Sequence, residues 1–107
     1  TSCGEDVSIQ SEIEPMKFNI ERSYPNPFNP YTIVTYTIPY NVKVQVYISD
    51  IVGRRVITLV NGNQDRGRKN IKWDGRNSYG RSVSAGVYYC TLLTDQFIKT
   101  HKLVLLK

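Results

Sequence analysis

Residues 24–30, with the sequence YPNPFNP, restrict the possible fold more than any other part of this chain. Proline fixes φ near about −65°, lacks an amide donor and pushes the preceding residue out of the α region. Three prolines within these seven residues therefore exclude a helix and a central β-strand. We expect a stiff connector at the entrance to a domain, which fixes where the preceding residues leave that domain.

The composition is that of an ordinary globular domain with a preference for strands. Of 107 residues, 40% are hydrophobic and 21% are charged, which excludes a wholly disordered chain. The eight tyrosines, together with many Val, Ile and Thr residues, favour β structure. Because no apolar run reaches about 18 residues, we expect no transmembrane segment.

The net charge of +5 bears on possible partners. A moderately basic surface attracts anionic polymers, so an anionic surface polysaccharide is one candidate partner. No recognition helix, zinc-ligand spacing or ordered aromatic platform accompanies the basic residues. We therefore expect no nucleic-acid partner.

Short alternating runs follow one another at the spacing typical of a β-sandwich. We predict strands at residues 17–23, 31–38, 42–49, 56–60, 70–73, 87–94 and 97–106. A turn is predicted at Asn61-Gly62, and no amphipathic helix is expected. The chain is therefore predicted to be all-β, an immunoglobulin-like antiparallel β-sandwich of about seven strands with an extended N-terminal tail. Residues 1–15 form the extension and residues 16–107 the sandwich.

Alternation within these runs also predicts which side chains face the core. The inward-facing residues are Val34, Tyr36, Ile38, Val44, Val46, Ile48, Ile71, Trp73, Tyr88, Cys90 and Leu92.

No catalytic or metal-binding set can be assembled from the sequence. The single histidine, His101, lies in a predicted strand beside lysines and has no orienting partner. In the loop 74–80, Arg76 stands where a calcium loop needs an oxygen ligand, so we expect Asp74 to cap the turn instead. We expect no enzyme, no catalytic residue, no metal and no cofactor.

The extension carries Val7, Ile9 and Ile13 at odd positions, which predicts a strand. Such a strand can add to the sheet of a neighbouring molecule. Cys3 and Cys90 are too far apart in sequence for a metal or redox pair. In an oxidising compartment they can form a disulfide, within one chain or between two.

The terminal residues 102–107, KLVLLK, are apolar at successive positions, whereas a half-exposed antiparallel strand alternates. This strand is therefore expected to be covered on both sides or to meet a partner with its outer face. Recognition by strand addition suits such a segment.

These motifs together resemble the C-terminal sorting domain of type IX secretion substrates, a family similar to the immunoglobulin-like domain of flagellar hook-capping proteins. The resemblance runs from about Phe18 to Lys107. It rests on YPNPFNP at 24–30, Asp50-x-x-Gly53-Arg54, Trp73-Asp74-Gly75, Gly80-Arg81, Gly86-Val87-Tyr88 and the terminal KLVLLK. The chain departs from the family at Tyr31, where a small hydroxyl residue is usual.

The resemblance implies a module that is exported to the periplasm and carried through the outer membrane to the cell surface or the medium. It also implies that the secretion machinery reads Lys102, Leu103, Val104, Leu105, Leu106 and Lys107. If the 107 residues are the whole mature protein, no cargo accompanies the module. We then expect the alternative, a subunit of an extracellular filament that assembles by donating its tail to the next copy.

Overall fold

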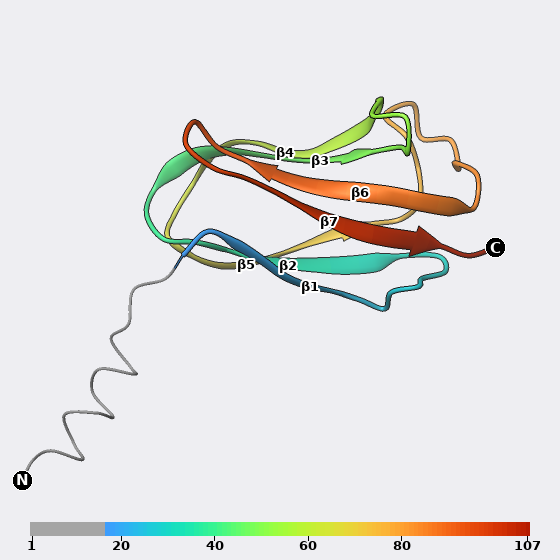
Figure 1. Cartoon of the computed structure of the whole chain (residues 1–107), viewed down its shortest axis with the longest axis horizontal. Coiled ribbons are helices and arrows are strands. Elements are labelled where there is room, and N and C mark those ends of the chain that lie inside the picture. Colours follow the sequence, from blue (N-terminus) through green and yellow to red (C-terminus); the bar gives the residue numbers. More distant parts are fainter. Residues whose placement is uncertain (1–16) are drawn as a thin grey trace, which may run out of the picture.

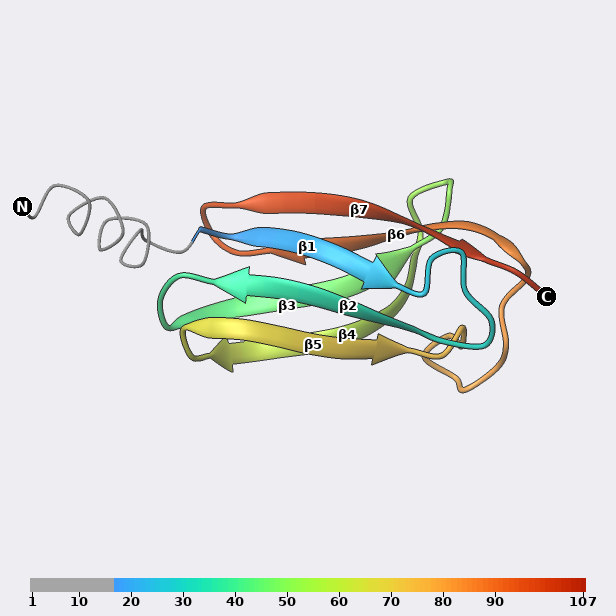
Figure 2. The same ribbon diagram turned by 90° about the horizontal axis from the view of Figure 1, so that it is seen from below.

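The computed structural model describes residues 17–107 and shows two antiparallel sheets packed face to face (Figure 1). The strands are β1 (Asn19–Tyr24), β2 (Thr32–Ile38), β3 (Val42–Ser49), β4 (Arg55–Gln64), β5 (Gly67–Trp73), β6 (Gly86–Leu93) and β7 (Ile98–Leu105). One sheet has the order β1-β2-β5 and the other β4-β3-β6-β7. Figure 2 shows β1 and β7 along one side of the sandwich and β4 and β5 along the other. The predicted all-β sandwich of seven strands is confirmed.

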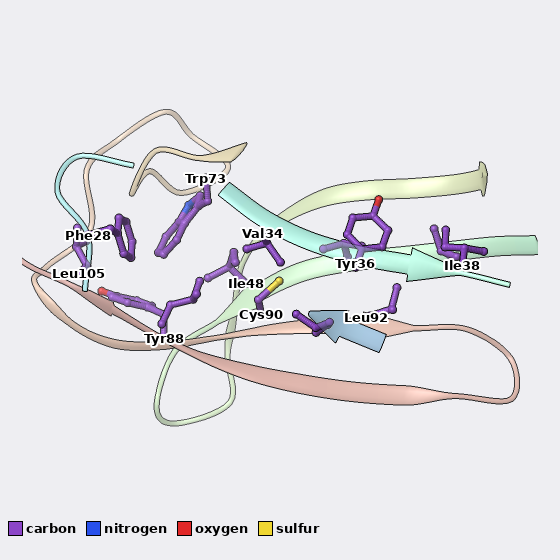
Figure 3. Close-up of a cluster of buried hydrophobic side chains, with 14 residues drawn as sticks. Phe28, Val34, Tyr36, Ile38, Ile48, Trp73, Tyr88, Cys90, Leu92 and Leu105 are labelled. Atoms are coloured by element: carbon purple, nitrogen blue, oxygen red, sulfur yellow. The ribbon is translucent and has the colours of Figure 1, made fainter. Parts of the chain in front are cut away.

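Alternate side chains of facing strands fill the space between the sheets (Figure 3). All but one of the residues predicted to face inward are buried, the exception being Ile71, which is partly buried. Trp73 is 1% exposed, and its indole N–H donates to the carbonyl oxygen of Arg76 at 2.9 Å. The Tyr36 hydroxyl donates to Oε1 of Gln64 at 2.7 Å. The two largest core residues with polar atoms therefore satisfy them at the rim of the core.

The predicted turn at Asn61-Gly62 is wrong, because β4 continues through it to Gln64. Asn61 pairs with Gln45 and Gly62 with Val44 on β3, so the ladder along β3 outweighs the local turn preference. The chain reverses at residues 65–66 instead, where the amide of Arg66 donates to Oδ1 of Asn41 at 2.9 Å. This reversal carries the chain from the four-stranded to the three-stranded sheet.

A five-residue turn at residues 50–54 joins β3 to β4. Oδ1 of Asp50 accepts the amides of Val52 at 3.0 Å and Arg54 at 2.9 Å. The Asp50 amide donates to the Arg54 carbonyl at 2.9 Å, and the Gly53 amide donates to the Asp50 carbonyl at 3.0 Å. Gly53 has a φ of 96°, a left-handed conformation that glycine adopts without strain.

Residues 77–81, in the loop between β5 and β6, repeat this construction. Oδ1 of Asn77 accepts the amides of Tyr79 at 2.9 Å and Arg81 at 3.1 Å. The Asn77 amide donates to the Arg81 carbonyl at 2.8 Å, the Gly80 amide donates to the Asn77 carbonyl at 3.0 Å, and Gly80 has a φ of 78°. Asn77 rather than the expected Asp74 therefore caps this turn. The Asp74 carboxylate instead lies 3.6 Å from the guanidinium of Arg76.

We expect Asp50→Asn to preserve the first turn better than Asp50→Ala, because Asn77 shows that an amide oxygen can accept both N–H groups. The melting temperature is predicted to fall more in Asp50→Ala than in Asp50→Asn. Asn77→Ala is expected to cost about 1 kcal/mol in free energy of unfolding. Equal melting temperatures for the wild type and both Asp50 variants would contradict this account of the turn.

The same turn gives a pH dependence with a definite sign. The backbone N–H of Arg54, assisted by that of Val52 and the Arg54 charge, lowers the pKa of Asp50 below its ordinary value. A carboxyl group whose pKa is lowered by folding stabilises the fold at pH values above the ordinary pKa of Asp. This contribution is lost as the pH falls through the pKa of the folded state. The stability advantage of the wild type over Asp50→Asn should therefore shrink on acidification.

Candidate functional site

β7 is an edge strand of the four-stranded sheet and carries most of the predicted recognition segment. Leu103 is 0% and Leu105 2% exposed, and both face the core. Lys102 is exposed and Val104 is half-buried on the opposite face. Leu106 is 49% exposed and lies beyond the end of the strand. The strand Ile98–Leu105 therefore alternates, so the expectation that it is covered on both sides is wrong. The other expectation, that its outer face meets a partner, stays a prediction.

Residues 24–30 close the free edge of β7, and we call them the clasp. The Phe28 amide donates to the Val104 carbonyl at 2.9 Å, and the Leu106 amide donates to the Phe28 carbonyl at 2.8 Å. The Asn26 side chain adds two bonds, donating through Nδ2 to the Lys102 carbonyl and accepting the Val104 amide on Oδ1, each at 3.0 Å. The edge groups of β7 from Lys102 to Leu106 are thus occupied from within the molecule.

The Phe28 ring anchors the clasp in the core. It is 1% exposed, and its centroid lies 5.4 Å from that of Trp73, which in turn lies 5.2 Å from that of Tyr88 (Figure 3). Burying a phenyl ring of this size contributes about 2–3 kcal/mol. The two backbone hydrogen bonds of Phe28 form a parallel bridge with Leu105. Phe28 is therefore fixed both by the packing of its ring in the core and by its backbone hydrogen bonds to β7 and Leu106.

A small polar group lies beside the clasp and contains the single histidine. The Ser23 hydroxyl is 2.9 Å from Nδ2 of Asn26 and 2.9 Å from Nε2 of His101. Burial lowers the pKa of His101 below its ordinary value, which favours the neutral ring. The hydrogen bond between Ser23 and His101 links β1 to β7. Because Ser23 also accepts from Asn26, the same group helps to fix the clasp.

Several predicted site residues cannot be placed. Cys3, Val7, Ile9 and Ile13 lie outside residues 17–107, so the donor strand, the filament and the Cys3–Cys90 disulfide stay predictions. Lys17 lies just before β1, where its carbonyl oxygen accepts the Thr37 hydroxyl at 2.8 Å. Figure 1 shows that β1 begins at the end of the sandwich opposite to the clasp. The expectation that the proline segment fixes the exit of the extension is therefore wrong. The clasp instead connects β1 to β2, after the chain has run the length of the sandwich.

The side chain of Cys90 is fully buried, and burial raises its pKa to about 12. A thiol with such a pKa is almost wholly protonated at neutral pH and so a poor nucleophile.

Within residues 17–107, no three His, Cys, Asp or Glu side chains are grouped so as to hold a metal ion. Residues 17–107 contain no helix that is long and apolar enough to span a membrane.

In a Cys3→Ser variant, we expect Cys90 to remain unreactive toward an aromatic disulfide reagent in native buffer, because its thiol is buried and protonated. It should react fully in denaturant. Absorbance of the released thiolate measures the rate under both conditions. Rapid stoichiometric reaction in native buffer would show that Cys90 is accessible.

The sequence indicated the clasp residues as a motif but not their contacts. Asn26 and Phe28 were assigned to a connector without partners. The available signal was that the clasp and residues 102–107 are the two most characteristic parts of the resemblance. Two such segments near opposite ends of the domain's sequence are candidates for mutual contact.

We expect Asn26→Ala to lower the free energy of unfolding by about 1–2 kcal/mol, because it removes two side-chain hydrogen bonds to β7. Hydrogen exchange should accelerate at the Val104 amide and much less at the Leu106 amide, whose acceptor is the Phe28 carbonyl. Phe28→Leu serves as the companion variant, since it keeps the backbone bonds while shrinking the ring. Equal protection of the Val104 amide from hydrogen exchange in Asn26→Ala and the wild type would contradict the hydrogen bond between Asn26 and Val104.

Comparison with known proteins identifies the domain. Residues 32–96, more than half of the chain, match the FlgD Ig-like domain family. Two solved structures from Porphyromonas gingivalis share the fold. Dimeric latent PorU has a TM-score of 0.62 at 21% identity, over 79% of this chain and 9% of that chain. PorZ, titled an essential bacterial surface component of the type-IX secretion system, has a TM-score of 0.54 at 22% identity.

The PorZ similarity covers 80% of this chain and 11% of PorZ, so the chain spans about a tenth of the length of either protein. No match to a curated protein was found. The sandwich thus shares its fold with a part of each of these two proteins. By the match of its central strands, this chain belongs to the FlgD Ig-like domain family.

Proposed function

We propose that this domain is a non-enzymatic sorting module for type IX secretion, which serves export and attachment at the cell surface. One observation carries the proposal. The two most characteristic segments of the resemblance, residues 24–30 and 102–107, meet through four hydrogen bonds made by Asn26 and Phe28. The clasp and the terminal strand therefore form one composite surface.

On this proposal the secretion machinery reads the outward side chains of the terminal segment rather than adding a strand to it. Strand addition at Lys102–Leu106 requires free backbone groups, and the clasp already uses them. The exposed Lys102 and Lys107, with the half-buried Val104 between them, remain available. Two cations flanking an apolar residue form a compact recognition element.

The fold shared with PorU and PorZ supports a location outside the cytoplasm. PorZ is a bacterial surface component. We propose that this domain also lies at the outer-membrane surface or in the medium. The partners proposed are the secretion machinery and an anionic surface polysaccharide, to which a net charge of +5 is suited. No cofactor is proposed.

A test of the proposal must change the surface without changing the fold. Deleting residues 102–107 would remove Leu103 and Leu105 from the core and confuse the two effects. The variant Lys102→Gln with Lys107→Gln changes only exposed side chains. Lys99→Gln is the matched control, because Lys99 is an exposed lysine of the same strand outside the segment.

Each variant is fused to a reporter enzyme and expressed in a bacterium with a type IX system. We expect export of the double variant to fall about tenfold or more, as for loss of two charge-assisted contacts. The control should be exported normally, and urea midpoints should be equal. Normal export of the double variant, with all midpoints equal, would refute the proposed recognition of these lysines.

Asn26→Ala distinguishes the two modes of recognition. If side chains are read, opening the clasp leaves export unchanged or reduces it in proportion to lost stability. Increased export would show that the machinery pairs with the edge of β7.

A further inference from the structure

Three large apolar side chains project into solvent from the two matching turns. Ile51 and Val52 are each 73% exposed, and Tyr79 is 85% exposed. Val52 and Tyr79 occupy the same position, two residues after the capping Asp50 and Asn77. Both turns lie at the end of the sandwich that holds the C-terminus (Figures 1 and 2).

The fold does not require apolar residues at these positions. Each turn is held by its capping side chain, its backbone bonds and a left-handed glycine. None of the three apolar side chains belongs to the hydrophobic core or packs against it. Polar residues would form the same turns, so the gathering of exposed apolar side chains at one end indicates an interaction surface.

Arginines accompany each exposed apolar residue. Arg54 and Arg81 stand at the fifth position of their turns, Arg55 follows the first turn, and Arg76 precedes the second. The carboxylates nearby are Asp50, bonded to Arg54 at 3.1 Å, and Asp74, 3.6 Å from Arg76. Four arginines against two aspartates leave residues 50–55 and 74–81 positively charged. We call these two ranges the tip surface.

The two halves of the tip surface are held together. The Ser78 amide in the second turn donates to the carbonyl of Val56 at 3.2 Å, and Val56 lies two residues beyond the first turn. This bond ties the second turn to the start of β4, directly after the first turn.

We propose that the tip surface docks on an anionic lipid membrane. Ile51, Val52 and Tyr79 enter the boundary between head groups and acyl chains, and Arg54 and Arg81 bind lipid phosphates. A lipid surface accepts separate projecting side chains without shape complementarity. A protein partner would have to match two turns at once over a large contiguous interface.

Docking in this way would hold the clasp and residues 102–107 near the membrane, because they lie at the same end (Figure 1). The inference stands independently of the proposed secretion function, since it concerns only lipid and the folded chain.

The test is sedimentation of the full chain with vesicles of phosphatidylcholine alone or mixed equally with phosphatidylglycerol. The apolar variant is Ile51→Ser, Val52→Ser, Tyr79→Ser. Ile98→Ser is the matched control, because Ile98 is 62% exposed and begins β7 at the opposite end of the sandwich. Arg81→Gln tests the charge without disturbing the Asp50–Arg54 pair.

We expect the wild type and Ile98→Ser to sediment with the anionic vesicles and much less with the neutral ones. The apolar variant should bind about tenfold or more weakly, and Arg81→Gln should bind less with a smaller salt dependence. Emission of a Tyr79→Trp variant should shift to shorter wavelength on anionic vesicles and be quenched by brominated acyl chains, against the constant background of the buried Trp73.

Three outcomes would overturn the proposal. The wild type could fail to bind anionic vesicles, the apolar variant could bind as tightly as the wild type, or brominated lipid could leave the new tryptophan unquenched. Self-association in the absence of lipid, lost in the apolar variant and without vesicle binding, would assign the surface to a second copy instead.

Discussion

The contact between the clasp and β7 is the interaction on which the rest of this sandwich depends. Two packed sheets share side-chain contacts but no ladder of hydrogen bonds. Here β1 belongs to the three-stranded sheet, and the segment that follows it bonds through Asn26 and Phe28 to the last strand of the other sheet. The Phe28 ring then fills the end of the core against Trp73 of β5. One short segment therefore ties both sheets together and closes the core between them.

The prolines explain why the clasp ends the sheet instead of extending it. An edge strand with free backbone groups is a site for unwanted pairing, and β7 is the edge strand of its sheet. Phe28 gives its amide to Val104, while Pro25, Pro27 and Pro30 have no amide to offer an incoming strand. The clasp can therefore cover β7 without presenting a new regular edge of its own. This is a physical reason for the pairing of the proline-rich residues 24–30 with the terminal strand β7.

Local periodicity was sufficient to predict the faces of the strands but not their partners. Residues such as Val46, Tyr88 and Cys90 were assigned to the core correctly because alternation is a property of a few consecutive residues. Asn61-Gly62 was misassigned because pairing with β3 decides its conformation. The contact between the clasp and β7 could not be derived from local periodicity, since no local pattern in YPNPFNP specifies Val104, and only the resemblance singled out both segments. The second turn could have been found, because Asn77-x-x-Gly80-Arg81 repeats the pattern of Asp50-x-x-Gly53-Arg54.

The sandwich has two unlike ends, and this asymmetry links its features. β1 begins at one end, whereas the clasp, the terminal residues and both capped turns lie at the other (Figures 1 and 2). β1 runs between these two ends and is paired with β2. Its paired backbone therefore separates Lys17 from the clasp and the capped turns. Ligand contacts made by Lys102, Lys107 or the tip surface therefore need no rearrangement at Lys17. The clasp, the terminal lysines and the tip surface therefore lie together, away from the end at which β1 begins.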